Sequence, residues 1–435
     1  MKSRRLFFLI CFAVLSCTGL FAQEGEEGRG DYLTLKIAVM GPGDELYFWW
    51  GHIALVIEDA VSGQNRFYDY GVFDFRQDNF FVNFVFGRLV YHCAATAAED
   101  NYGIYRAANR DITLYTLDLP AAAKEEIRLS AERNVLPENR NYYYHHFDDN
   151  CATRIRDIID MAVGGAFKET FGEAPGRYTL RQHVRRHTWF SPFYDWILNF
   201  LMGQVIDRPI TVWDEMFLPS EIGRRIERFS YAGSAGTERK LVARVEILNR
   251  AVNRPAALDV PRRQWPRELV FSAGLSLVLL LFMGMRSRAR TARAGRVLLG
   301  LSQSCLGVFF GLAGSVLFFM SFFTNHDYTY QNSNLLYVNP LLLAAVPLGC
   351  ISLSKKPRRR FAAEQFLKSL WTYVFLGGML SMVIKLFPGF YQQNQVDQAL
   401  TLPVAFALSF FPRWIGRMFP RSRRPAVGRE GAEGA

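Results

Sequence analysis

Long apolar runs separated by short basic segments fill the last third of the chain, and they constrain its fold more than any other feature. Membrane-spanning helices need about 20 apolar residues, and candidate runs lie at 269–285, 297–322, 339–354, 366–386 and 398–412. Arginine and lysine are concentrated after the first, third and fifth runs, whereas 324–338 and 387–398 contain neither. Because basic loops stay in the cytoplasm, the pattern predicts five spans, with the residues before them outside.

The N-terminus has the pattern of an export signal. Three basic residues among the first five precede an apolar stretch at 6–15, and small residues follow. We predict a signal peptide at 1–22, cut after Ala22. A lipobox-like sequence that ends at Cys17 offers an alternative processing site, at which that cysteine would be lipidated.

The two features together divide the chain. We predict a periplasmic domain at 23–265, a transmembrane domain at 266–412 with a polar outer loop at 324–338, and a basic cytoplasmic tail at 413–435. The formal net charge of +11 does not indicate nucleic-acid binding, because many of the arginines lie in the loops between spans, as membrane topology requires.

The exported segment changes from strand-like to helical patterning along its length. Short β-branched and aromatic runs between turn residues predict strands at 32–40, 53–58, 67–71 and 112–119, with Tyr105 continuing the strand pattern. Helical spacing begins at Ala121. The clearest helix is 151–163, where Asp149 or Asn150 can cap the start. This part of the chain is therefore of the α+β class.

A cysteine–histidine pair is the strongest chemical signal. Cys151 begins the amphipathic helix, where unpaired backbone amides and the helix dipole favour a thiolate. His52 begins a predicted strand directly after Gly51 and is the candidate general base. Asp69, on the next strand, is the candidate for orienting the imidazole.

Alternatives to this pair remain open. His145 and His146 are competing bases close to the cysteine in sequence. Cys93 and Cys151 are the two cysteines of the exported segment, and in an oxidising compartment they could form a disulfide. His183 and His187 lack the glutamate and third ligand of a zinc protease, so no metal site is predicted.

Three motifs at this site resemble one family. They are Gly51-His52-Ile53-Ala54, the segment 68–75, and Asn150-Cys151 followed by Ala-Thr-Arg-Ile-Arg-Asp. They resemble the N-terminal periplasmic domain of the Lnb-type lipoprotein N-acyltransferases. Segment 215–219 is similar to the C-terminal signature of that domain, and 326–340 resembles the family's membrane part. More distantly, the order of histidine before cysteine resembles circularly permuted papain-like proteins such as the NlpC-type amidases.

The resemblance implies a fold and an activity. The fold would be an α+β permuted papain-like domain followed by an all-α bundle of about five spans in the bacterial inner membrane. A phospholipid would donate an acyl chain to Cys151, and the N-terminal amine of an apolipoprotein would accept it, without a cofactor. We assign catalysis to Cys151, His52 and Asp69. We assign substrate binding to Asn150, Arg154, His326, Asn332 and Asn334.

Two other functions are compatible with the same residues. The first is an extracytoplasmic cysteine peptidase or amidase with the same dyad, although an extensive bundle exceeds what such a hydrolase needs as an anchor. The second is a non-enzymatic membrane protein in which Cys93 and Cys151 are bridged.

Overall fold

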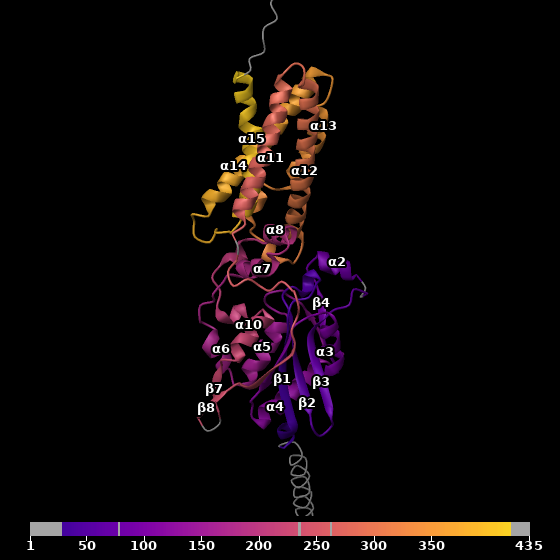
Figure 1. Cartoon of the computed structure of the whole chain (residues 1–435), viewed down its shortest axis with the longest axis vertical. Helices are drawn as coiled ribbons and strands as arrows, with labels where there is room; N and C mark the ends of the chain where they lie inside the picture. Colours follow the sequence, from indigo (N-terminus) through magenta and orange to yellow (C-terminus); the bar gives the residue numbers. More distant parts are fainter. Residues whose placement is uncertain (1–27, 77–78, 234–235, 262, 419–435) are drawn as a thin grey trace, which may run out of the picture. The chain divides into compact units, whose positions relative to one another are not determined.

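The structure is a computed structural model that describes residues 28–76, 79–233, 236–261 and 263–418 (Figure 1). The predicted signal peptide, 1–22, and most of the predicted tail lie outside these residues. The chain forms two compact units: residues up to 190 together with 208–261, and residues 191–207 together with those from 262 onward. Segment 191–207 thus groups with the second unit, although it lies inside the range predicted for the first domain.

The first unit is built on a seven-stranded antiparallel sheet with the order β6-β4-β3-β2-β1-β5-β9. Its strands are β1 (Leu33–Met40), β2 (His52–Asp59), β3 (Gln64–Val72), β4 (Val90–Ala97), β5 (Ile112–Leu117), β6 (Asn141–Tyr143) and β9 (Val242–Asn249). A separate hairpin pairs β7 (Ser230–Ala232) with β8 (Glu238–Lys240).

Alternating side chains give the sheet two buried faces. Leu55 and its alternate neighbours on β2 enter a core shared with α4 (Ala121–Asn134), α5 (Cys151–Ala162) and α10 (Pro219–Ile226). Val56 and its own alternate neighbours enter a second core with α3 (Ala98–Ala107). Because successive strand residues point to opposite faces, helices cover both sides of the sheet. Shorter helices complete the unit: α2 (Phe80–Val85), α6 (Ala166–Phe171), α7 (Leu180–Thr188) and α9 (Val212–Glu215).

Most predicted elements of this unit are confirmed. The four predicted strands correspond to β1, β2, β3 and β5, and α5 begins at Cys151 as predicted. The strand prediction for Tyr105 is wrong, because this residue lies in α3. Glu99 and Asp100 in the first turn and Arg106 in the last complement the helix dipole there, and they outweigh the β propensity of one tyrosine.

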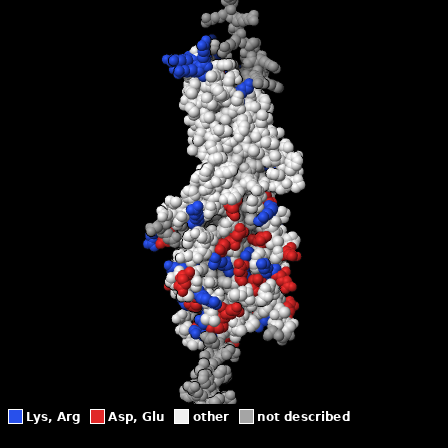
Figure 2. Space-filling view, turned by 180° about the vertical axis from the view of Figure 1, so that it is seen from behind, with Lys and Arg blue, Asp and Glu red and all other residues white. Residues whose placement is uncertain are grey.

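The second unit is helical. It contains α8 (Pro192–Leu201), the 3-10 turn η3 (Gln204–Asp207), α11 (Trp265–Ser287), α12 (Ala292–Phe323), α14 (Pro357–Ile384) and α15 (Gln395–Met418). Between α12 and α14 the chain makes three 3-10 turns, η4 (Asp327–Thr329), η5 (Ser333–Leu336) and η6 (Pro340–Ala344), and then α13 (Ala345–Ile351). Figure 2 shows the flank of this unit as a broad band almost without charged side chains, with basic residues gathered at its end.

Four helical stretches among the described residues are long and apolar enough to cross a membrane: Trp265–Ser287, Ala292–Phe323, Ser333–Ile351 and Pro357–Ile384. They correspond to the first four predicted spans. The fifth predicted span, 398–412, lies within α15, which is helical but is not among these four. The five-span count therefore stays a prediction.

Candidate functional site

Cys151 is the first residue of α5, and the helix start is capped by its neighbour. Asn150 Oδ1 accepts hydrogen bonds from the amides of Ala152 and Thr153, at 2.8 and 3.0 Å. The Thr153 hydroxyl in turn accepts from the Asn150 amide at 2.8 Å, which completes a capping box. Within the described part of the chain the amide of Cys151 itself has no hydrogen-bond partner. A free backbone donor thus lies beside the thiol.

The other end of the Asn150 side chain ties this helix to a distant segment. Asn150 Nδ2 donates to the carbonyl of His146 at 2.6 Å and to that of Phe217 at 3.1 Å. Asn150 is 4% exposed, and both ends of its carboxamide are occupied. Its hydrogen bonds thus hold the start of α5 in place next to Cys151. The predicted role of Asn150 in substrate binding stays a prediction.

Glu215 anchors the segment that carries Phe217. Its buried carboxylate accepts hydrogen bonds from the amides of Arg177 and Tyr178, at 2.7 and 2.9 Å, and from His183 Nε2 at 3.2 Å. Burial raises the pKa of Glu215, but these donors lower it below its ordinary value overall. Arg225 completes the set from α10 at 3.3 Å. His183 is thus occupied in a hydrogen bond to Glu215.

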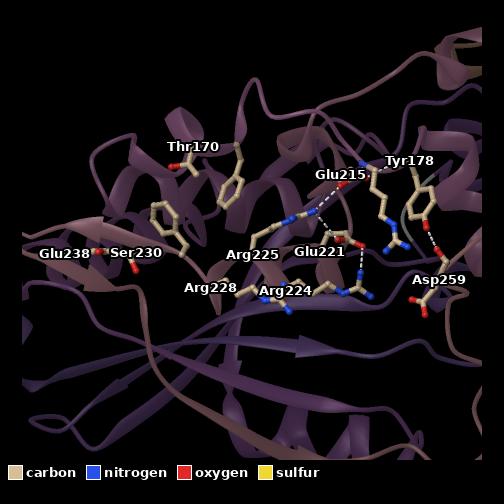
Figure 3. A pocket seen from close by; sticks show the side chains of 13 residues that line it. Thr170, Tyr178, Glu215, Glu221, Arg224, Arg225, Arg228, Ser230, Glu238 and Asp259 are labelled. Carbon is tan, nitrogen blue, oxygen red and sulfur yellow. Dashed lines mark hydrogen bonds and ion pairs between the residues drawn. The ribbon is translucent and has the colours of Figure 1, made fainter.

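Figure 3 shows this anchor on the wall of a pocket of about 700 Å³, with Arg225 directed at Glu215 and Arg224 at Glu221. The lining combines arginines and carboxylates in similar numbers. Both glutamates are almost fully buried in ion pairs. The pocket is therefore lined by a network of structural ion pairs.

His52 and Asp69 meet on neighbouring strands of the sheet. His52 Nε2 lies 2.9 Å from Asp69 Oδ1, and the same oxygen accepts the amide of Gly71 at 2.7 Å. A Cβ atom at position 71 would lie 2.8 Å from His52 Cε1, so the imidazole rests directly on the glycine. Gly51, with φ of +81°, carries the chain into β2 in a conformation that favours glycine.

Electrostatics favour a protonated His52. Burial alone lowers its pKa, but the charge of Asp69 and the ionisable groups of Tyr105 and Cys151 raise it well above the ordinary value of 6.5. Burial raises the pKa of Asp69, yet His52 holds it below its usual range. Among the described residues, neither His52 Nδ1 nor Cys151 Sγ has a hydrogen-bond partner. Nδ1 is thus the His52 nitrogen open to a further partner, and Cys151 is near enough to contribute to the raised pKa of His52.

Tyr105 and Arg110 are two further groups at this site, and the sequence analysis missed both. The Tyr105 ring stacks near His52 at 6.3 Å, and the Arg110 guanidinium lies 4.7 Å from the ring centroids of both Tyr105 and Phe48. Arg110 is 2% exposed, and its Nε donates to the Gly41 carbonyl. Its buried Nη2 has no hydrogen-bond partner within the residues that the structure describes. Burial lowers its pKa. Burying a cation without a carboxylate partner costs free energy. A negative charge that develops nearby during a reaction would offset that cost.

The remaining predicted residues near α5 have other partners. Arg154 makes a bidentate ion pair with Asp149, at 2.7 and 3.0 Å, and lies 3.7 Å above the Tyr142 ring. His145 Nδ1 accepts the amide of Asp148 at 3.0 Å. His146 packs against Trp50 with centroids 5.0 Å apart, and burial lowers its pKa to about 4. His146 is therefore neutral at physiological pH, while Asp69 supports His52.

Three predicted substrate-binding residues lie in the second unit. His326 is buried with Nδ1 3.0 Å from the Tyr328 hydroxyl. Asn332 Nδ2 donates to the carbonyls of Phe200 and Leu201 in α8, at 2.8 and 3.1 Å. Asn334 Nδ2 donates to the Phe200 carbonyl at 3.0 Å. The two asparagines thus connect the end of α8 to the η5 segment within the second unit.

Cys93 and Cys151 are both free thiols in the structure. Cys93 is buried on β4, and burial raises its pKa to about 11. The alternative of a Cys93–Cys151 disulfide is therefore wrong.

The architecture defines a class of protein, a mixed α/β domain joined to a multi-span helical membrane domain. Comparison with known families makes this specific: residues 27–186 match the Lnb N-terminal periplasmic domain, and residues 268–392 match the Lnb transmembrane domain. The chain belongs to the Lnb family, a family of lipoprotein N-acyltransferases. Its first domain is accordingly periplasmic. No curated protein and no solved structure matches the chain.

Proposed function

We propose that this chain acylates the N-terminal amine of lipoproteins through a thioester on Cys151, with a phospholipid of the bacterial inner membrane as donor and no cofactor. His52 is the general acid and base, and Asp69 fixes its ring. The observation that carries the proposal is the His52–Asp69 pair at 2.9 Å, which leaves Nδ1 free, together with Cys151 at a capped helix start.

In the first half-reaction the Cys151 thiolate attacks an ester carbonyl of the phospholipid. The carbon–sulfur bond forms, the ester carbon–oxygen bond breaks, and the imidazolium of His52 gives its proton to the departing alkoxide of the lysophospholipid. The free Cys151 amide is suited to donate to the oxyanion, and the Arg110 guanidinium, whose Nη2 has no hydrogen-bond partner among the described residues, adds positive charge nearby.

In the second half-reaction the α-amine of a diacylglyceryl-cysteine attacks the thioester. The amide bond forms, the carbon–sulfur bond breaks, and His52 takes the proton that the nitrogen loses. The thiolate is restored, so the cycle consumes no other reactant. A donor that lies in a bilayer accounts for the attachment of the catalytic domain to a membrane domain.

The proposed organisation of the chain follows the same reading. We infer a permuted papain-like arrangement for the periplasmic domain, supported by a histidine strand that precedes a cysteine helix. We also propose five spans with a polar outer loop at 324–338, a cytoplasmic tail at 413–435 and a periplasmic domain within 23–265. Cysteine-accessibility labelling from the two sides of the membrane tests this topology.

Mass spectrometry tests the chemistry. The purified full chain is incubated with phospholipid vesicles beside Cys151→Ser and His52→Ala. We expect an acyl adduct on Cys151 that neutral hydroxylamine removes, that a diacylglyceryl peptide discharges, and that both variants lack. Discharge by water at the same rate with or without the peptide would instead identify a hydrolase. An adduct on any other residue would contradict the assignment of Cys151.

A further inference from the structure

A second pocket lies within the helical membrane unit. It has a volume of about 580 Å³ and is lined by side chains from four helices, α11, α12, α14 and α15. Part of its lining is buried and apolar, from Met283, Leu299, Leu367 and Leu408. Cavities of this size hold small organic ligands, so the pocket has room for the headgroup of one lipid.

The pocket lies at the cytoplasmic end of this unit. Helix α11 follows the periplasmic domain, so as a span it enters the membrane from the periplasm, and Arg286 in its last turn reaches the cytoplasmic side. Arg296 and Arg360 line the same pocket from the first turns of α12 and α14. The walls are in direct contact there, because a Cβ atom at Gly295 would lie 2.3 Å from the backbone nitrogen of Arg286.

Positive charge predominates in the lining. Four basic side chains and one carboxylate contribute to it: Arg286, Arg296, Arg360, Lys368 and Glu364. Arg286 Nη2 donates to Glu364 at 2.6 Å, so the carboxylate is engaged. Within the part of the chain that the structure describes, the guanidinium groups of Arg296 and Arg360 have no hydrogen-bond or ion-pair partner. These two arginines are therefore open to an anion.

Burial separates these arginines from the basic residues that membrane topology requires. Arg296 and Arg360 are half-buried, whereas Arg293 and Arg358, at the same ends of α12 and α14, are exposed. The positive-inside rule needs basic residues near the ends of the spans, and it does not need them inside a cavity. Burial of a cation without a carboxylate costs free energy, and an anion bound in the pocket would offset that cost.

We propose that this pocket binds the headgroup of an anionic phospholipid of the cytoplasmic leaflet, and that Arg296 and Arg360 hold its phosphate. Guanidinium groups bind phosphate oxygens in pairs, and basic pockets between membrane helices on the cytoplasmic side suit anionic headgroups. Phe361, which also lines the pocket and is 64% exposed, offers apolar surface to an acyl chain. This lipid is distinct from the proposed acyl donor, because Cys151 lies in the periplasmic domain.

Native mass spectrometry of the full chain in detergent micelles measures this binding directly. Phosphatidylglycerol and phosphatidylethanolamine with the same acyl chains are titrated onto the unsubstituted chain and onto Arg296→Gln/Arg360→Gln. The matched control is Arg293→Gln/Arg358→Gln, which removes the same charge from exposed positions of the same two helices. We expect the pocket variant to bind phosphatidylglycerol at least about tenfold more weakly, because hydrogen bonds to charged groups contribute that much. The control should bind it as the unsubstituted chain does.

Three outcomes would overturn the proposal. Equal affinity of the unsubstituted chain for the two lipids would exclude a site for an anionic headgroup. An equal loss of affinity in both double variants would leave these arginines with a role in topology alone. Binding of inorganic phosphate as tight as that of phosphatidylglycerol would identify a site for a free anion instead of a lipid.

Glu364→Gln changes the charge of the pocket in the opposite direction. It removes the one carboxylate among the described residues that line the pocket, and it releases Arg286. Phosphatidylglycerol should therefore bind several-fold more tightly, a gain that misfolding does not produce. Unchanged or weaker binding would contradict the assignment of the charges. None of these measurements uses acyl transfer, so their outcome is independent of the proposed function.

Discussion

Gly71→Ala is the sharpest test of the site because it removes no functional group. The added Cβ would lie 2.8 Å from His52 Cε1 and 3.4 Å from His52 Nδ1. Carbon atoms in contact prefer separations of about 3.5–4.0 Å, so the imidazole must move by roughly 0.7 Å or more. The backbone of Gly71 does not have the positive φ that would strain an alanine, so the effect is confined to this contact.

Displacement of the imidazole translates into a loss of rate. A misplacement of about 1 Å of a catalytic group can cost about 10²-fold, so acyl-enzyme formation should slow by roughly ten- to a hundredfold. The assay is the time course of the hydroxylamine-sensitive adduct on Cys151. Gly103→Ala, within α3 and with open space around the new Cβ, is the control, and it should keep the wild-type rate. A Gly71→Ala protein that acylates as fast as this control would refute the placement of the His52 ring.

Three further changes probe the groups around this ring. Asp69→Asn removes the charge that raises the pKa of His52. In the pH profile of the acylation rate, the decline at alkaline pH should therefore move to lower pH. If the decline stays at the same pH, it reports the titration of another group. The raised pKa of His52 also stabilises the folded state. This stabilisation is fully present below the ordinary pKa of 6.5 and is lost as the pH rises through the pKa that His52 has in the folded protein. Asp69→Asn should therefore lower the free energy of unfolding most at pH values below 6.5. Asn150→Ala should cost about 2–4 kcal/mol, from the lost cap and two unpaired carbonyls, measured as urea-dependent alkylation of buried Cys93. Arg110→Gln should slow alkylation of Cys151 by iodoacetamide several-fold, with Arg110→Lys intermediate; equal rates would exclude an electrostatic role.

Local sequence patterns were sufficient for the elements that carry the proposed nucleophile and base. The continuous apolar run 53–57 in β2, buried throughout, reflects two buried faces of the sheet. Asn150 with Thr153 three residues later is a capping pattern visible in sequence. The pairing of Ala54 with Asp69 follows from two adjacent strands joined by a short turn. These features depend on residues close together in the chain, which is why the sequence analysis placed them.

The groups missed by the sequence analysis reach the site through distant contacts. Arg110 precedes β5, which pairs with β1 across a long sequence separation. Tyr105 reaches His52 only because α3 packs on the sheet face opposite α5. Neither position carries a local pattern that distinguishes it from a surface residue. A buried arginine without a carboxylate becomes visible only when the packing is known.

The asparagines of the membrane unit show that residues predicted to bind substrate can also have a structural role, and their binding role stays a prediction. A loop rich in asparagine and flanked by apolar runs suggested substrate contacts, yet the carboxamides of Asn332 and Asn334 each make four hydrogen bonds within the protein. Freeing a buried donor or acceptor costs about 1–3 kcal/mol, so a lipid headgroup would have to replace several bonds at once. Polar residues in apolar surroundings are commonly satisfied by their own chain. A donor lipid that binds at these asparagines would therefore have to compete with the hydrogen bonds that they make within the protein.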